Sequence, residues 1–98
     1  MWQRKKMSRR TVKNDLILRM RLYLAELPDP KHARNLEQVS YRSWSRSTVL
    51  YLIEQIEDSD TDPALIVSEF IKKVDKRSGL LFRVAYDTAV DLYDHIFL

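Results

Sequence analysis

The residues with the clearest chemical potential are an aspartate and a histidine near the C-terminus. Asp91 and His95 are four positions apart, so on a helix they share one face, with Asp87 one turn earlier and Asp94 beside them. This pair could offer two ligands to a divalent metal ion. No cysteine and no third histidine supports such a site, so we expect a structural acidic face, with no metal, no cofactor and no catalytic role.

Other catalytic arrangements are not indicated either. The serines cluster between positions 40 and 47, with no histidine in register to activate one of them as a nucleophile. The single glycine, Gly79, excludes the glycine-rich loops that hold phosphates in P-loop and dinucleotide-binding proteins. We therefore expect a protein that is not an enzyme.

A basic and aromatic N-terminus indicates a different chemistry, the binding of nucleic acid. The first thirteen residues carry six basic groups and no acid, and Trp2 is available to stack on a base. Arg42, Trp44 and Arg46 repeat this mixture. Basic residues of this kind bind phosphates by releasing counterions. The candidate contacts in the N-terminus are Arg4, Lys5, Lys6, Arg9, Arg10 and Lys13.

The net charge of +3 is unevenly distributed along the chain. Residues 1–34 contain ten basic and three acidic residues, whereas the remainder contains seven basic and eleven acidic residues. We predict that residues 1–10 form a flexible basic arm and residues 11–98 a single helical domain. A nucleic-acid-binding regulator is the alternative function, although the two prolines at 28–30 do not suit a helix-turn-helix. Binding to an anionic lipid surface is a lesser alternative.

The elements that must position these residues are helices. One glycine among 98 residues leaves few of the tight turns that β-hairpins need. Proline, aspartate and glycine interrupt the chain at 28–30, 62–63 and 78–79, which leaves four helical segments. The sequence therefore predicts an all-α fold, a compact bundle or orthogonal array of four to five helices.

The limits of these helices follow from their flanking residues. The first is predicted at about 11–27. The second begins with Asp29 as N-cap and Pro30 as its first residue, and the serines of 40–48 are expected to bend it or to divide it into helices at about 30–40 and 45–58. The third is capped by Asp62 and closed by Gly79 as its C′ residue. The fourth covers residues from about 80 to the apolar end, which we expect to be packed.

Apolar residues at spacings of three and four mark the predicted core. Each segment carries one such stripe, and the third and fourth have clearly polar opposite faces. The stripes consist of Val12, Leu16, Met20, Tyr23 and Leu27; Val49, Leu50, Leu52, Ile53 and Ile56; Ile66, Val67, Phe70, Ile71 and Val74; and Leu81, Phe82, Ala85, Ala89, Leu92, Tyr93 and Ile96.

Several apolar residues do not fit these stripes and indicate a binding surface. Leu18 and Leu22 are four apart and lie away from the main stripe of the first helix. Trp44, Thr48 and Tyr51 fall together if their segment is helical, with arginines nearby, and aromatic residues and arginine are enriched in binding hot spots. The predicted function is a non-enzymatic protein–protein interaction module, self-associating or partner-binding. Its candidate contacts are Leu18, Leu22, Trp44 and Tyr51; the alternative is that other parts of the chain cover them as core.

No segment of the sequence suggests a membrane span. The most apolar run, 16–27, is interrupted by Arg19, Arg21 and Glu26, and a span needs about 20 apolar residues. The N-terminal residues lack the apolar core of a signal peptide. We therefore expect a cytoplasmic protein.

Overall fold

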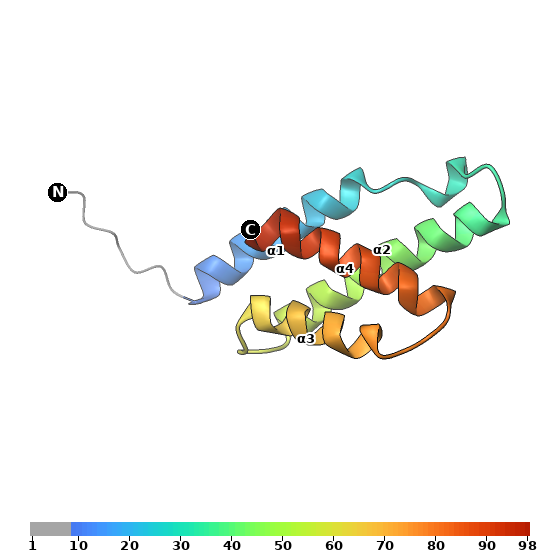
Figure 1. Cartoon of the computed structure of the whole chain (residues 1–98). Coiled ribbons are helices and arrows are strands. Elements are labelled where there is room, and N and C mark those ends of the chain that lie inside the picture. The colour runs from blue at the N-terminus through green and yellow to red at the C-terminus, as the bar shows by residue number, and fades with distance from the viewer. Residues whose placement is uncertain (1–8) are drawn as a thin grey trace.

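The computed structural model describes residues 9–98, with side chains from Val12 onward. This part of the chain forms four α-helices, labelled in Figure 1, and one short 3-10 helix, without a strand. The helices are α1 (Arg9–Glu26), α2 (Leu36–Glu57), α3 (Pro63–Asp75) and α4 (Leu80–Phe97), and the 3-10 helix is η1 (Pro30–His32). The prediction of an all-α fold is confirmed.

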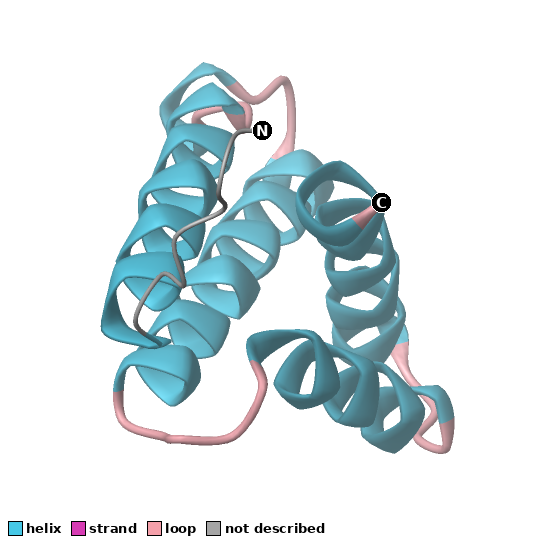
Figure 2. Ribbon diagram, turned by 90° about the vertical axis from the view of Figure 1, so that its left-hand side faces the viewer, coloured by secondary structure: helices cyan, strands magenta, loops and turns pink. Residues whose placement is uncertain are grey.

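The helices form two antiparallel hairpins that pack against each other. Figure 2 shows the α1–α2 hairpin on one side and the α3–α4 hairpin on the other. Arg46 Nη1 of α2 donates to Leu24 O of α1 at 3.2 Å, and Arg21 of α1 pairs with Glu57 of α2 at 3.3 Å. The core lies where the hairpins meet, and all four helices contribute to it: Ile17, Met20, Val49, Leu52, Ile53, Ile56, Val67, Ala89, Leu92 and Ile96.

Side-chain caps fix the starts of α2 and α3. Asn35 Oδ1 accepts a hydrogen bond from Gln38 N at 2.9 Å, and Gln38 Oε1 accepts one from Arg34 N at 2.9 Å. Asp62 Oδ1 accepts from Ala64 N at 3.1 Å, and the next residue is a proline at the first helical position. These bonds satisfy N–H groups that a helix start leaves without partners, and the predicted Asp62 cap is present.

The predicted division into two helices at 40–48 is wrong, because α2 is continuous through this segment. The hydroxyls that were expected to weaken the helix have partners that the helix allows. Thr48 Oγ1 donates to Trp44 O at 2.8 Å, and Ser45 Oγ accepts from Thr88 Oγ1 of α4 at 2.8 Å. The interruption lies earlier, between η1 and Asn35, because Asp29 and Pro30 start a 3-10 turn rather than a full helix.

Gly79 has a different role from the predicted C′ position. α3 ends at Asp75 with Lys76 as its C-cap, and Gly79 is the N-cap of α4. Its φ of 117° lies where side chains are strongly disfavoured. Glycine therefore serves the turn into α4 rather than the end of α3.

Some predicted core positions are on the surface. Val12, Leu50 and Leu81 are exposed, although each belongs to a predicted apolar stripe. The expected packing of the C-terminal end holds for Ile96, which is buried, but not for Leu98, which is 89% exposed. No helix of residues 9–98 is long and apolar enough to cross a membrane.

Candidate functional site

A groove of about 690 Å³ lies between α2 and α3, and we call it the α2–α3 groove. Leu52 and Gln55 of α2 and Thr61 of the connecting loop are among the residues that line it. Its volume is within the range of about 300–1,000 Å³ that is typical of ligand pockets. The other lining residues are Tyr51, Leu65, Ile66, Glu69, Phe70, Lys72, Lys73, Lys76 and Arg77.

The floor of the α2–α3 groove is apolar and aromatic. The rings of Tyr51 and Phe70 lie 5.6 Å apart at an angle of 41°. Tyr51 is 45% exposed and Leu65 47% exposed, while Leu52, which also lines the groove, is buried. Large apolar side chains that stay half exposed in a concave site can lose further contact with water when a ligand binds.

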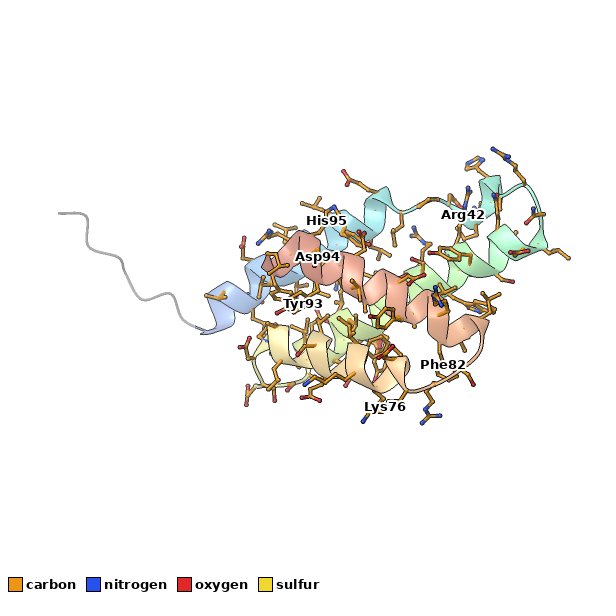
Figure 3. All side chains as sticks on the ribbon, in the orientation of Figure 1. Arg42, Lys76, Phe82, Tyr93, Asp94 and His95 are labelled. Atoms are coloured by element: carbon orange, nitrogen blue, oxygen red, sulfur yellow. The ribbon has the colours of Figure 1, made fainter. Side chains whose placement is uncertain are left out.

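One edge of the groove is basic, and we call Lys72, Lys73, Lys76 and Arg77 the basic rim. Figure 3 shows Lys76 at the C-terminal end of α3. Within residues 12–98, Lys73 and Lys76 have no ion-pair partner, and Lys72 approaches Glu69 at 4.0 Å. The guanidinium of Arg77 lies 5.6 Å from the centre of the Phe82 ring, which holds it beside the start of α4.

The residues predicted to form one interaction surface do not come together. Leu18 and Leu22 are 56% and 59% exposed and form the outer face of α1. Tyr51 instead lies in the α2–α3 groove, none of whose lining residues belongs to α1. Trp44 is half-buried and Thr48 is buried. The sequence indicated Tyr51 but not its neighbours on α3, because no pattern within either helix indicates that α3 packs beside α2.

The predicted nucleic-acid contacts are only partly described. Arg4, Lys5 and Lys6 lie outside the described residues, as do the side chains of Arg9 and Arg10, whose backbone begins α1. The ammonium group of Lys13 is used within the protein: its Nζ donates to Glu57 O at 3.0 Å and Ser59 O at 2.8 Å. Lys13 therefore satisfies carbonyl groups at the end of α2.

Arg42 and Arg46, the two arginines on either side of Trp44 in the sequence, also form hydrogen bonds within the protein. Arg42 Nη1 donates to Asp29 O at 2.9 Å, and Arg46 Nη1 donates to Leu24 O. Figure 3 shows Arg42 at the end of the bundle that contains η1. These two arginines hold the connection between α1 and α2, and their contacts do not depend on a ligand.

A smaller pocket of about 350 Å³ lies among α1, α2 and α4. Four of its polar groups are bonded to one another, through the Thr88–Ser45 bond and a bond of 2.6 Å from Tyr23 Oη to Asp91 Oδ2. Burial of the ring and the bond to Asp91 raise the pKa of Tyr23 far above its usual value. These two bonds link α1 with α4 and α2 with α4.

The acidic face of α4 is part of the same contact with α1. His95 Nδ1 lies 3.7 Å from Asp91 Oδ2, and its ring meets that of Tyr23 edge-on at 5.4 Å. Arg19 Nη2 donates to His95 O at 3.4 Å. Among the described residues, no three potential ligands gather to hold a metal ion.

The α2–α3 groove combines an exposed apolar floor with charges that lack partners among residues 12–98. Its lining is suited to non-covalent binding, because it places apolar contact area beside cations. Comparison of the chain with protein-family models, with curated proteins and with solved structures finds no match.

Proposed function

We propose that this protein is a small non-enzymatic binding module that takes a segment of a partner protein in the α2–α3 groove. The observation that carries the proposal is the half-exposed ring of Tyr51, which lines the groove together with the half-exposed Leu65 and the buried Leu52. Tyrosine gives a large contact area and keeps a polar hydroxyl for orientation.

The occupant is a peptide segment that carries aliphatic or aromatic side chains. Burying apolar area contributes about 25 cal/mol per Å², so two half-exposed side chains over an apolar floor favour an occupant with apolar anchors. The groove lies at the surface between α2 and α3 and is lined by residues of both helices, which suits an extended or helical segment better than an enclosed small molecule.

The experiment is a selection from a displayed library of random peptides, with the full chain as bait. We expect enriched peptides to bind, and their amide shift perturbations in NMR spectra to map to α2 and α3. Replacing Tyr51 and Leu65 together by alanine should weaken binding by at least about tenfold, because central aromatic contacts carry much of an interface's affinity. Both side chains are about half exposed, so the variant should remain folded.

The matched control replaces Leu18 and Leu22 by alanine on the outer face of α1. Both are large apolar residues with similar exposure, but they do not line the groove. Peptide affinity should be unchanged in this control. Failure to enrich any peptide, or shift perturbations confined to α1, would contradict the proposal.

A nucleic-acid-binding regulator is the second candidate function. It is supported by the six basic residues among the first thirteen. Lys13 already binds two carbonyl oxygens of the protein, so the candidate contacts reduce to Arg4, Lys5, Lys6, Arg9 and Arg10.

A further inference from the structure

We infer that the segment bound in the α2–α3 groove is acidic, with carboxylates placed beside its apolar anchors. The inference rests on the proposed function and adds the charge of the partner. The four cations of the basic rim share the groove with a single acid, Glu69. A negatively charged segment would meet complementary charge along this edge, which favours both its encounter and its orientation.

The helix dipole of α3 accounts for only part of this charge. Lys72 and Lys73 lie in the last turn of α3 and Lys76 is its C-cap, positions where cations are favoured. The C-terminal end of a helix corresponds to about half a negative charge. Four cations exceed that requirement, and the ion pair of Lys72 with Glu69 is long and exposed. The excess positive charge therefore remains available to a ligand.

The N-terminus of the chain does not suit the groove. Residues 1–13 carry six basic groups and no acid, so the basic rim would repel them. A second copy could offer the acidic face of α4, but two of its three carboxylates are engaged within the protein, since Asp87 lies 3.7 Å from Arg83 and Asp91 accepts the hydroxyl of Tyr23, which leaves Asp94. A separate acidic partner therefore fits better than either part of this chain.

The shape of the floor favours a peptide over a nucleic acid. Proteins that bind single strands stack successive bases on aromatic side chains. Here Tyr51 supplies one exposed ring, since Phe70 is half-buried against it. Leu65 and Ile66 are aliphatic, and they match the aliphatic or aromatic side chains of a peptide rather than a phosphate backbone.

The experiment repeats the peptide selection with a charge variant, Lys73→Glu combined with Lys76→Glu. Its control is Lys31→Glu with Arg34→Glu, which changes the net charge equally at exposed positions that do not line the groove. We expect the unaltered protein to enrich acidic peptides with apolar anchors. Their affinity should fall by at least about tenfold in the charge variant and little in the control, and it should fall as salt rises from about 50 to about 500 mM.

The outcomes separate this inference from the proposed function. Enriched peptides that are neutral or basic, and that lose binding only with Tyr51→Ala and Leu65→Ala, would overturn the acidic partner and leave the groove as the binding site. No enrichment would overturn both.

Two further measurements test the other occupants. Tighter binding of a single-stranded oligonucleotide, weakened by the charge variant and not by Tyr51→Ala, would overturn the inference in favour of nucleic acid. A dimer in light scattering that the charge variant abolishes would assign the groove to a second copy and overturn it as well.

Discussion

The hydroxyl of Tyr23 donates a hydrogen bond of 2.6 Å to Oδ2 of Asp91 and so links the first helix to the last. We expect Tyr23→Phe to lower the free energy of unfolding, because the bond is lost. The loss should be only about 1 kcal/mol, because the exposed carboxylate of Asp91 then binds water instead. Urea denaturation measures this change. An unchanged midpoint would show that the bond contributes nothing to stability.

The same tyrosine predicts a dependence on alkaline pH. Burial and the neighbouring Asp91 raise the pKa of Tyr23 above the unfolded value of about 10. The contribution of Tyr23 to the free energy of unfolding is therefore fully present below a pH of about 10. It is lost as the pH rises further, since the unfolded chain then releases a proton that the folded protein retains. The stability difference between the protein and Tyr23→Phe should shrink above that pH. A difference that stays constant would contradict the raised pKa.

The buried hydrogen bond between Ser45 and Thr88 should matter more than either hydroxyl alone. Thr88→Val leaves the Ser45 oxygen buried without its donor, and we expect a loss of about 1–3 kcal/mol. The double variant with Ser45→Ala should recover part of this loss. A double-mutant cycle by denaturant unfolding measures the coupling, and strictly additive effects would argue against a bond between the two groups.

Gly79 should tolerate no side chain without strain. An added Cβ would meet only Phe82 Cδ2 at 3.9 Å, an ordinary contact, so the cost of Gly79→Ala comes from its φ of 117°. We expect a loss of about 1–3 kcal/mol, the usual cost of such backbone geometry. The neighbouring exposed residue gives the control, Ser78→Ala, which should leave the melting temperature almost unchanged. Equal melting temperatures for the two variants would refute the assignment.

The outer face of α1 can be tested separately from the groove. Leu22 is 59% exposed, so we expect Leu22→Asp to stay folded, whereas Met20→Asp, at a fully buried position, should unfold the protein. If Leu18 and Leu22 form a contact between copies, Leu22→Asp should convert a dimer to a monomer in light scattering. An unfolded Leu22→Asp variant would instead place this residue in the core.

Binding to nucleic acid predicts a particular dependence on salt. Affinity for a labelled oligonucleotide should fall steeply as salt rises, with a slope set by the number of neutralised phosphates. Arg9→Ala with Arg10→Ala should flatten the slope. Lys13→Ala should lower stability with little effect on the slope, because its ammonium group binds Glu57 O and Ser59 O. Absence of binding at low salt would eliminate this function.

The helices that sequence predicted best are those whose signals are local. Asp62 is the N-cap of α3 and Pro63 its first residue, as their residue types predict. The one-sided apolar stripe of α4 predicts the helix that the structure contains. Ser45 shows why α2 was harder. Its effect on a helix depends on whether another helix supplies a partner, and Thr88 does so from α4.

The candidate site was predictable only in part. Tyr51 stood out by its type and its position off the core stripe, but the groove exists because α3 packs against that side of α2 and places Phe70 beside its ring. The basic residues of α3 were visible in the sequence and had a sufficient local explanation in the helix dipole. These basic residues carry more positive charge than the helix dipole explains. This excess charge became informative only when the structure placed the residues at the edge of the α2–α3 groove.

The 68 positions that separate Tyr23 from Asp91 bear on how fast the chain reaches its native state. Within each hairpin, contacts next to the connection join residues that are close in sequence, and those farther out in the α1–α2 hairpin reach separations of 44 to 46 positions, as for Lys13 with Glu57 and Ser59. Helical proteins rich in local contacts fold in about microseconds to milliseconds. The link between α1 and α4 must close a longer loop, which costs chain entropy. We expect this loop to close after both hairpins have formed. We therefore expect substitutions at Tyr23 to accelerate unfolding more than they slow folding.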